Sequence, residues 1–458
     1  MAINSPTYDP ATTAAALADK YISGARQVLD ARTDRANATD KGLRDLSSAL
    51  SAYQSALSSL TGLNKTMFAQ SAAFSDTSVG TATATAAAAT GSYSFFVEKL
   101  ATANQVSYSN LPSSPAAAGG KLIVRSSSAS FEIDITGADA DGDNTVTVRE
   151  LAAAINGASS NSLASASVVT VGGVQQLMLT SKNTGVANAV TLDASLVGDA
   201  ALKTALTTPA NVKTVTAAQD AVVWLGAQTT GTKIEQASNT FNVIDGVKMT
   251  FTKTTTTPVT LTVAADNNAT TANVQAFVDA YNKLKSALDT MVAPGDAAKG
   301  VAAGSLSGDS GIVALRDRLI SILRPVGADS LANYGITANR QGTLSVDATR
   351  LNKALATKPG GLDAIIGTSA GSTPTGLAGK LDAYLKTWTN ASTGQIKSRR
   401  EAVDKAQVEL TSRQSLLDKQ YDTAYQRYLL QFTQLQAMQS QMSSNSSMFD
   451  ALFASDKD

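Results

Sequence analysis

The stretch YDTAYQRYLLQFTQLQAMQSQMSSNSSMFDALF, residues 421–453, decides which kind of fold this chain can adopt. It contains no charged side chain between residues 428 and 449, yet large apolar side chains recur at the three- and four-residue intervals of an α-helix. The seam that they form is Tyr421, Tyr425, Tyr428, Phe432, Leu435 and Met442. A seam of this spacing is typical of a helix that packs against other helices, so we expect something to cover it.

The same helix is expected to begin after residue 395, because neither Pro nor Gly interrupts the chain from there to about residue 443. Its upstream heptad line is Ile396, Val403, Leu410, Leu417 and Ala424. The charged first half can stand in water as a two-helix coiled coil, whereas the uncharged second half would expose an apolar surface. The one unpaired helical stripe left in the chain is weak (Leu17, Tyr21 and Val28) and short, so we expect other chains to cover the second half.

Two stronger helical stripes lie further inside the chain, and they match each other in length. The first is Leu43, Leu46, Leu50, Tyr53, Leu57 and Leu60; the second is Val274, Phe277, Tyr281, Leu284, Leu288 and Met291. We expect them to share the core of a helical bundle with further helices that begin near residues 312 and 377.

Between these stripes the hydrophobic period changes from helical to two, which is typical of strands. Gly172-Gly173 and Asp245-Gly246 are expected to form hairpin turns, and one amphipathic helix, TVRELAAAIN, interrupts the strands at residues 147–156. The Ala/Thr-rich stretch SVGTATATAAAATGS before them is expected to be a loop or a poorly ordered linker.

The predicted fold is therefore a multidomain α+β protein with a β-rich head inserted into a helical bundle. Residues 1–42 and 395–458 are expected to form a terminal coiled-coil leg, and residues 43–90 and 271–394 the bundle. Residues 91–270 are expected to form the head, as two subdomains divided near residues 200–212.

Composition excludes several classes of function. The 37 basic and 37 acidic residues cancel, which predicts binding to neither nucleic acid nor an anionic membrane. No apolar run is long enough to span a bilayer. The chain has no Cys and no His, which removes catalytic triads with either residue, zinc thiolate sites and disulfides. No secretory signal is expected in MAINSPTYDPATT, so an export route of another kind is predicted if the protein leaves the cell.

The best candidate for a metal site is DADGDNTVTVRE, which places Asp139, Asp141, Asp143 and Glu150 at positions 1, 3, 5 and 12 of an EF-hand loop. The turn glycine of that motif is replaced by Asn144, and a strand rather than a helix precedes the loop. Glu150 is explained equally by a capping box for the helix that follows. We therefore predict no metal, no cofactor, no catalytic residue and no enzymatic activity.

Seven segments in order resemble one family, the flagellar filament cap proteins, also called hook-associated protein 2. They are SALSAYQSALSSLTG, FSDTSVGTATATAAAATGSYSFFVEKLATANQV, LTSKNTG, ASNTFNVIDGVKMTF, FVDAYNKLKSAL, GITANRQGTLSVDATRLNKAL and FTQLQAMQSQMSSNSSMFDALF. The resemblance implies a leg, a bundle and an outward head, assembled as a homo-oligomeric ring, often of five copies, at the distal tip of a bacterial flagellum. It also implies secretion through the flagellar type III export apparatus with an export chaperone, and retention and folding of exported flagellin beneath the cap.

The residues expected to bind filament and cap partners are the seam residues Tyr421, Tyr425, Tyr428, Phe432, Leu435 and Met442, with Met448, Phe449, Leu452 and Phe453 as a terminal anchor. Two alternatives share some of these features. Another flagellar axial protein, either flagellin or a hook-filament junction protein, also has helical termini around a β-rich insertion. A surface adhesin could bind host glycans through the Ser/Thr-rich head.

Overall fold

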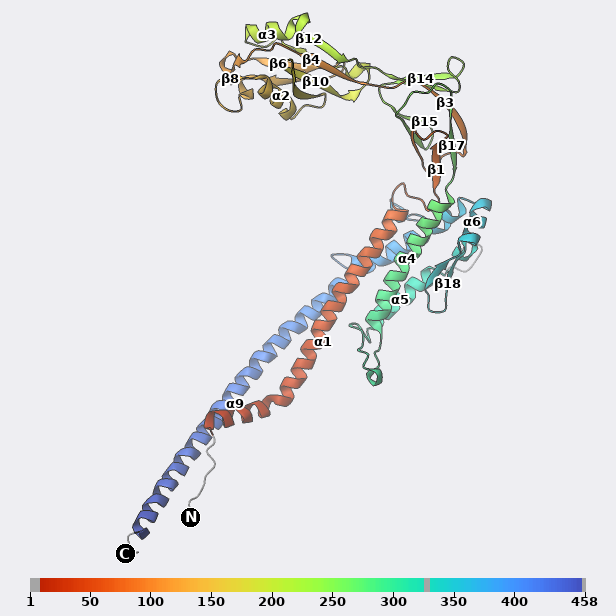
Figure 1. The fold of residues 1–458 in the computed structure, drawn as a ribbon. Coiled ribbons are helices and arrows are strands. Elements are labelled where there is room, and N and C mark those ends of the chain that lie inside the picture. Colours follow the sequence, from red (N-terminus) through yellow and green to blue (C-terminus); the bar gives the residue numbers. More distant parts are fainter. Residues whose placement is uncertain (1–8, 325–329, 455–458) are drawn as a thin grey trace. The chain divides into compact units, whose positions relative to one another are not determined.

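A computed structural model describes residues 9–324 and 330–454 of the chain, with the side chains of Asp450 and of 452–454 excepted (Figure 1). The chain divides into two compact units. One unit, the strand unit, is Phe68–Thr270; the other, the helical unit, comprises the chain up to Met67 and from Thr271 onward.

Two of the helices of the helical unit are much longer than the rest. They are α1 (Pro10–Thr61) and α9 (Gln395–Ala454), of 52 and 60 residues. The shorter helices are α4 (Asn267–Val292), α5 (Ser310–Ile322), α6 (Ala348–Thr357), α7 (Gly361–Ile366) and α8 (Gly376–Thr389), with a hairpin of β18 (Ile336–Ala338) and β19 (Leu344–Val346). The α1 helix starts where Asp9 accepts hydrogen bonds from the backbone N–H groups of Ala11 and Thr12, with Pro10 as the first helical residue.

Most residues of the two predicted stripes lie in the core of the bundle, together with buried residues of α5 and α8. Leu43, Leu46 and Leu50 of α1 are fully buried, as are Val274 and Phe277 of α4. The Tyr281 hydroxyl donates to the Gly342 carbonyl at 3.1 Å, which satisfies it in the core. The Tyr53 hydroxyl, by contrast, is buried with no hydrogen-bond partner among the described residues. Burial raises the pKa of Tyr281 to about 12 and raises the pKa of Tyr53 further above its ordinary value.

The strand unit contains two hydrophobic cores. The first lies between a five-stranded sheet, in the order β1-β17-β3-β13-β14, and a three-stranded sheet, β15-β16-β2. The bounds of these strands are β1 Gln70–Phe74, β2 Gly80–Ala84, β3 Gly91–Lys99, β13 Ala221–Leu225, β14 Thr232–Gln236, β15 Thr240–Ile244, β16 Val247–Phe251 and β17 Val259–Ala265. The rings of Phe74, Phe95 and Phe241 lie around Phe251, with centroids 5.2–6.0 Å from its ring.

The second core lies between a four-stranded sheet, β12-β4-β10-β9, and a three-stranded sheet, β11-β6-β7, with two helices and the small β5-β8 pair. The bounds are β4 Ala103–Tyr108, β5 Ser114–Pro115, β6 Lys121–Arg125, β7 Ser130–Asp134, β8 Thr145–Val146, α2 Val148–Gly157, β9 Ala164–Val171, β10 Val174–Thr184, β11 Thr191–Asp193, α3 Ala200–Thr207 and β12 Val212–Thr216. Figure 1 shows β12, β4 and β10 of the sheet side by side.

Most local predictions in this region are confirmed. Gly172 and Gly173 form the turn between β9 and β10, with φ of 59° and 83°. Gly246 takes φ of 72° between β15 and β16. The helix predicted at 147–156 is α2, and its capping box is present: Thr147 and Glu150 each bond to the other's backbone N–H.

Two predictions differ from the structure. The stretch predicted as a loop before residue 91 contains β2, which pairs with β16. Its alternating Thr and Ala give too little hydrophobic contrast for periodicity to reveal a strand. The head was also expected to divide once, near residues 200–212. In the structure the second core is built from a segment that is inserted, in the sequence, between two groups of strands of the first core. Pairing of β3 with the distant β13 and β17 joins those two groups, and a local period does not encode such pairing.

The predicted class, an α+β fold with long terminal helices and a β-rich insertion, is confirmed. Within the described ranges, no helix combines the length and the hydropathy that crossing a bilayer requires.

Candidate functional site: the paired terminal helices

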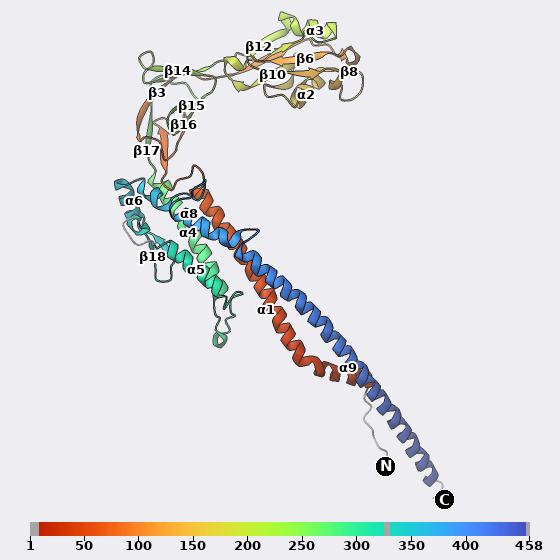
Figure 2. The ribbon, with the colours of Figure 1, turned by 180° about the vertical axis from the view of Figure 1, so that it is seen from behind.

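The first half of α1 and the helix α9 lie side by side and antiparallel (Figures 1 and 2). Ala14, Ala18 and Ile22 on α1 are at most 1% exposed, and Leu417 and Ala424 on α9 are 6% and 3% exposed. Half-buried Leu410 and Tyr421 pack against the cluster of Ile22, Leu29 and Leu417. The seam is therefore narrow, since alanine on one side lets the two backbones approach closely.

Polar contacts fix the register of this pair. Gln407 donates from Nε2 to Oδ1 of Asn37 at 3.2 Å. Nearer the start of α1, the Arg427 guanidinium lies 5.9 Å from the ring of Tyr21 and 4.9 Å from the ring of Tyr428. The Gln407–Asn37 and Arg427–Tyr21 contacts join the two helices, so they oppose sliding of one along the other.

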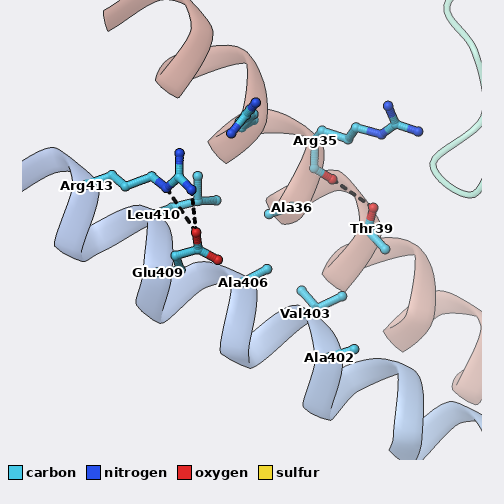
Figure 3. Close-up of a pocket in the computed structure, with 10 residues that line it drawn as sticks. Arg35, Ala36, Thr39, Ala402, Val403, Ala406, Glu409, Leu410 and Arg413 are labelled. Carbon is cyan, nitrogen blue, oxygen red and sulfur yellow. Dashed lines mark hydrogen bonds and ion pairs between the residues drawn. The ribbon is translucent and has the colours of Figure 1, made fainter. Parts of the chain in front are cut away.

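Beside the Gln407–Asn37 contact α1 stands away from α9 and leaves a gap of about 400 Å³, lined from residues 32–39 of α1 and 402–413 of α9 (Figure 3). Val403 and Leu410 project from α9 toward the gap, and Glu409 pairs there with Arg413 at 2.6 Å. The two predicted heptad residues that face the gap are half-buried rather than fully covered, because the partner helix is displaced here.

The base of α9 is attached firmly to the bundle. The Arg399 guanidinium pairs with the carboxylate of Asp309 and lies 5.4 Å above the ring of Trp388. Asp309 also caps α5, since it accepts from the N–H groups of Gly311 and Ile312. On α1, Gly42 leaves no room for a side chain, because an added Cβ would lie 2.6 Å from Ser305 Oγ.

The structure divides the predicted partner-binding residues into two groups. The aromatic residues Tyr421, Tyr425, Tyr428 and Phe432 are half-buried within the described chain. The rings of Tyr421 and Tyr425 are stacked, with centroids 6.3 Å apart and planes 6° from parallel. The chain therefore covers part of the seam that other molecules were expected to cover.

The second group is uncovered. Leu435 is 40% exposed, and Met442, Met448 and Phe449 are 60–63% exposed. The backbone of Leu452 and Phe453 continues the helix, but their side chains lie outside the described residues. This part of α9 extends beyond the start of α1 in both views (Figures 1 and 2).

The weak N-terminal stripe of α1 is mostly exposed, although Tyr21 lies near Arg427 of α9. Leu17, Tyr21 and Val28 are 36%, 63% and 55% exposed, whereas the neighbouring face with Ala14 and Ala18 is buried. The buried face of α1 combines the small residues Ala14 and Ala18 with the larger Ile22 and Leu29. The spacing of the largest side chains alone does not identify this face.

Sequence reasoning also missed Met438, which is 60% exposed. Together with three predicted residues it continues the three-four alternation past the paired region. We define the end stripe as Leu435, Met438, Met442 and Phe449. Met448 lies off this stripe by about 100° of helix rotation from Phe449. The signal was present in the spacing, and it could have been found by extending the heptad beyond Leu435.

In the acidic loop of the strand unit, the carboxylates accept hydrogen bonds from nearby backbone N–H groups. Carboxylate oxygens of Asp139, Asp141 and Asp143 come within 4.8 Å of one another. Asp139 accepts from the backbone N–H groups of Gly142 and Asn144. Glu150 accepts from the Thr147 and Ala140 N–H groups, and these bonds lower its pKa, with Thr147 as the largest cause. Loop structure and helix capping therefore account for these carboxylates.

The end stripe lies on a helix with no charged residue between Tyr428 and Phe449. Such a surface can bind other helices through apolar burial and through amide and hydroxyl hydrogen bonds. Because its neighbours are Gln, Ser and Asn rather than charged residues, binding would depend little on salt.

Known proteins match this chain over most of its length. The family model for the flagellar hook-associated protein 2 N-terminus matches residues 8–104, and the model for its C-terminus matches residues 218–444. The lateral flagellar hook-associated protein 2 of Vibrio parahaemolyticus is 37% identical over 381 residues, which cover 81% of this chain and 83% of that protein. The flagellar hook-associated protein 2 of Escherichia coli K12 is 28% identical over 431 residues, 89% of this chain and 88% of that protein.

A solved structure agrees with these matches. The crystal structure of the D1, D2 and D3 domains of the flagellar cap protein of Escherichia coli superposes with a TM-score of 0.60. It is 26% identical in sequence, and the alignment covers 80% of this chain and 99% of that chain.

Proposed function

The chain belongs to the flagellar hook-associated protein 2 family, the proteins of the flagellar cap, and from that premise we propose how its two ends act. The cap lies at the tip of the filament. We propose that the helix pair formed by α1 and α9 descends from the cap, and that the end stripe docks between helices of the filament subunits, flagellin, beneath it. The action is binding and release of protein surfaces, with no chemical step.

The observation that carries this proposal is the change in exposure along α9. Leu417 and Ala424 are buried against α1, whereas Leu435, Met438, Met442 and Phe449 are 40–63% exposed on an uncharged helix. Full burial of a large apolar side chain contributes roughly 1.5–3 kcal/mol. Scaled by these exposures, covering the end stripe stabilises a complex by about 3–7 kcal/mol before the cost of association.

A docking energy of this size suits a cap that must remain bound and still move. The base of α9 is held by Arg399 and Asp309, so the end stripe is presented from a fixed support. Its contacts lack charged partners of defined geometry, so several neighbouring registers have similar energy. The cap can then release and dock again as each new subunit is added.

The remaining parts of the proposal concern partners and location. We propose that several copies assemble as a ring, often five in this family, and that the ring retains exported flagellin while it folds. The protein reaches the tip by secretion through the flagellar type III export apparatus, with an export chaperone bound before export. We take the predicted leg, bundle and head as its domains, and we extend the head from residues 91–270 to the whole unit Phe68–Thr270.

The test is complementation of a strain that lacks this gene with a chain that ends after Gln434. The buried α9 residues that pack against α1, among them Leu417 and Ala424, remain, so the truncated protein should fold and be exported. We expect short filaments and flagellin monomers in the medium. Wild-type filament length with normal retention of flagellin, at equal amounts of exported cap protein, would refute the docking role.

A further inference from the structure

The four-stranded sheet β12-β4-β10-β9 ends in two free edges, and the β9 edge is unprotected. The sequence of β9, ASASVVTV, contains neither a charged residue nor Pro. By contrast β14, at the edge of the five-stranded sheet, carries Lys233 and Glu235, which pair at 2.7 Å. Charged side chains on an edge strand oppose pairing with another chain, so β9 lacks a common protection.

Half of the β9 edge is closed by side-chain amides. Asn156 accepts from the Ala166 N–H at 2.8 Å and donates to the Ala166 carbonyl at 2.7 Å. Asn161 accepts from the Ala164 N–H at 3.1 Å and donates to its carbonyl at 2.8 Å. Each amide therefore bonds to the strand much as a neighbouring strand would.

The other half of the edge is open. Residues along an antiparallel strand alternate between bonding to the neighbouring strand and facing away from it. Because Ala164 and Ala166 face away from β10, Val168 and Thr170 do so as well. Their N–H and C=O groups have no hydrogen-bond partner in the part of the chain that the structure describes.

The opposite edge of the same sheet, β12, is open in a similar way. Lys213 faces Ser107 of β4 in register, so its neighbours Val212 and Thr214 direct backbone groups outward. The Val212 N–H bonds to the Pro209 carbonyl. The Val212 carbonyl and both backbone groups of Thr214 have no partner within the described ranges.

We propose that the open segment of β9, Val168–Thr170, pairs with Val212–Thr214 of β12 in the next copy of the chain, so that the sheet continues from copy to copy. The two edges lie at opposite ends of one sheet, as a head-to-tail interface requires. Each carries an exposed β-branched side chain, Val171 at 56% and Val215 at 50%, which can pack across the new pair. This inference rests on the proposed ring, because a two-fold β9–β9 contact would leave β12 unpaired.

The absence of cysteine from the sequence allows a clean cross-linking test. The strands of this sheet alternate in direction, so β9 and the next copy's β12 pair antiparallel and Thr170 lies opposite Val212. Filaments are isolated from cells that carry T170C, V212C or the double variant T170C/V212C, then oxidised and run on non-reducing gels. Adjacent residues of a strand pair lie about 5.5 Å apart at Cα, within the reach of a disulfide. We expect a ladder of covalent oligomers from the double variant and none from either single variant. A dimer from T170C alone, or no ladder from the double variant, overturns the inference.

A second pair of variants tests the backbone itself. T170P removes an outward N–H that bonds to nothing in the described chain, and T170V changes the side chain but keeps that N–H. We expect T170P to lower the fraction of capped filament tips severalfold and T170V to match the parent. Equal capping by T170P overturns edge pairing. If filaments grow normally while these tests fail, only this inference fails, because the truncation after Gln434 tests the docking role separately.

Discussion

Replacing Met438 and Met442 by serine tests the end stripe most directly. These side chains are 60% and 63% exposed, lie four residues apart on one face of α9, and make up about half of the exposed apolar surface of the stripe. Full burial contributes roughly 1.5–3 kcal/mol for each, so the fraction still to be covered is worth about 2–4 kcal/mol for the pair. The double variant M438S/M442S should therefore dock between thirtyfold and several hundredfold more weakly.

The measurement is a titration of purified full-length protein onto uncapped filament ends, with tip occupancy counted by electron microscopy. Because both side chains are already exposed in the free chain, the free energy of unfolding should stay within about 0.5 kcal/mol of the parent. The matched control is L430S, since Leu430 is 60% exposed on the same helix but lies about 110° of helix rotation from the centre of the stripe. We expect L430S to titrate as the parent does.

Two results would refute this reasoning. A titration of M438S/M442S that superimposes on the parent would show that the stripe is not the docking surface. An equal loss in L430S would show that general hydrophobicity of α9, rather than one face, determines binding.

Three further predictions concern the helical unit. Y53F should leave the free energy of unfolding unchanged or raise it by about 1–3 kcal/mol, since it removes a buried hydroxyl that has no described partner; a clear loss of stability in urea denaturation would contradict this. The free energy of unfolding should be independent of Tyr281 below pH 10 and should fall as the pH rises from 10 to 12, because the unfolded tyrosine ionises near 10 and the folded one near 12. Y281F should flatten that part of a denaturation profile, and an unchanged slope would refute the assignment. D309A removes both the cap of α5 and the partner of Arg399, and should cost about 1–3 kcal/mol by thermal denaturation with far-UV circular dichroism; D317A, at an exposed site on the same helix, is the control and should cost little.

Sequence was sufficient where local patterns determine structure. The stripes that begin at Leu43 and Val274 are buried as their spacing predicts, and the turn at Gly172 and the capping box at Thr147 form as their residue types require. These features depend on side-chain period or on single backbone conformations, which the sequence states directly.

Sequence was insufficient where the structure depends on what lies opposite a residue. Ala14 and Ala18 contact α9 although their stripe carries little hydrophobicity, since close approach favours small side chains. The aromatic half of the predicted site, from Tyr421 to Phe432, is partly covered within the chain, whereas Leu435, Met442, Met448 and Phe449 are 40–63% exposed. The amides of Asn156 and Asn161 close one end of β9 from residues outside the strand, and no pattern within the strand reveals this.

The α1 helix belongs to two assemblies at once. From Ala14 to Leu29 it is half of the helix pair, and from Leu43 to Leu57 it is part of the bundle core, with no break in 52 residues. A force or torque applied to the first turns of α1 is therefore transmitted along one continuous helix to the buried residues of the bundle core.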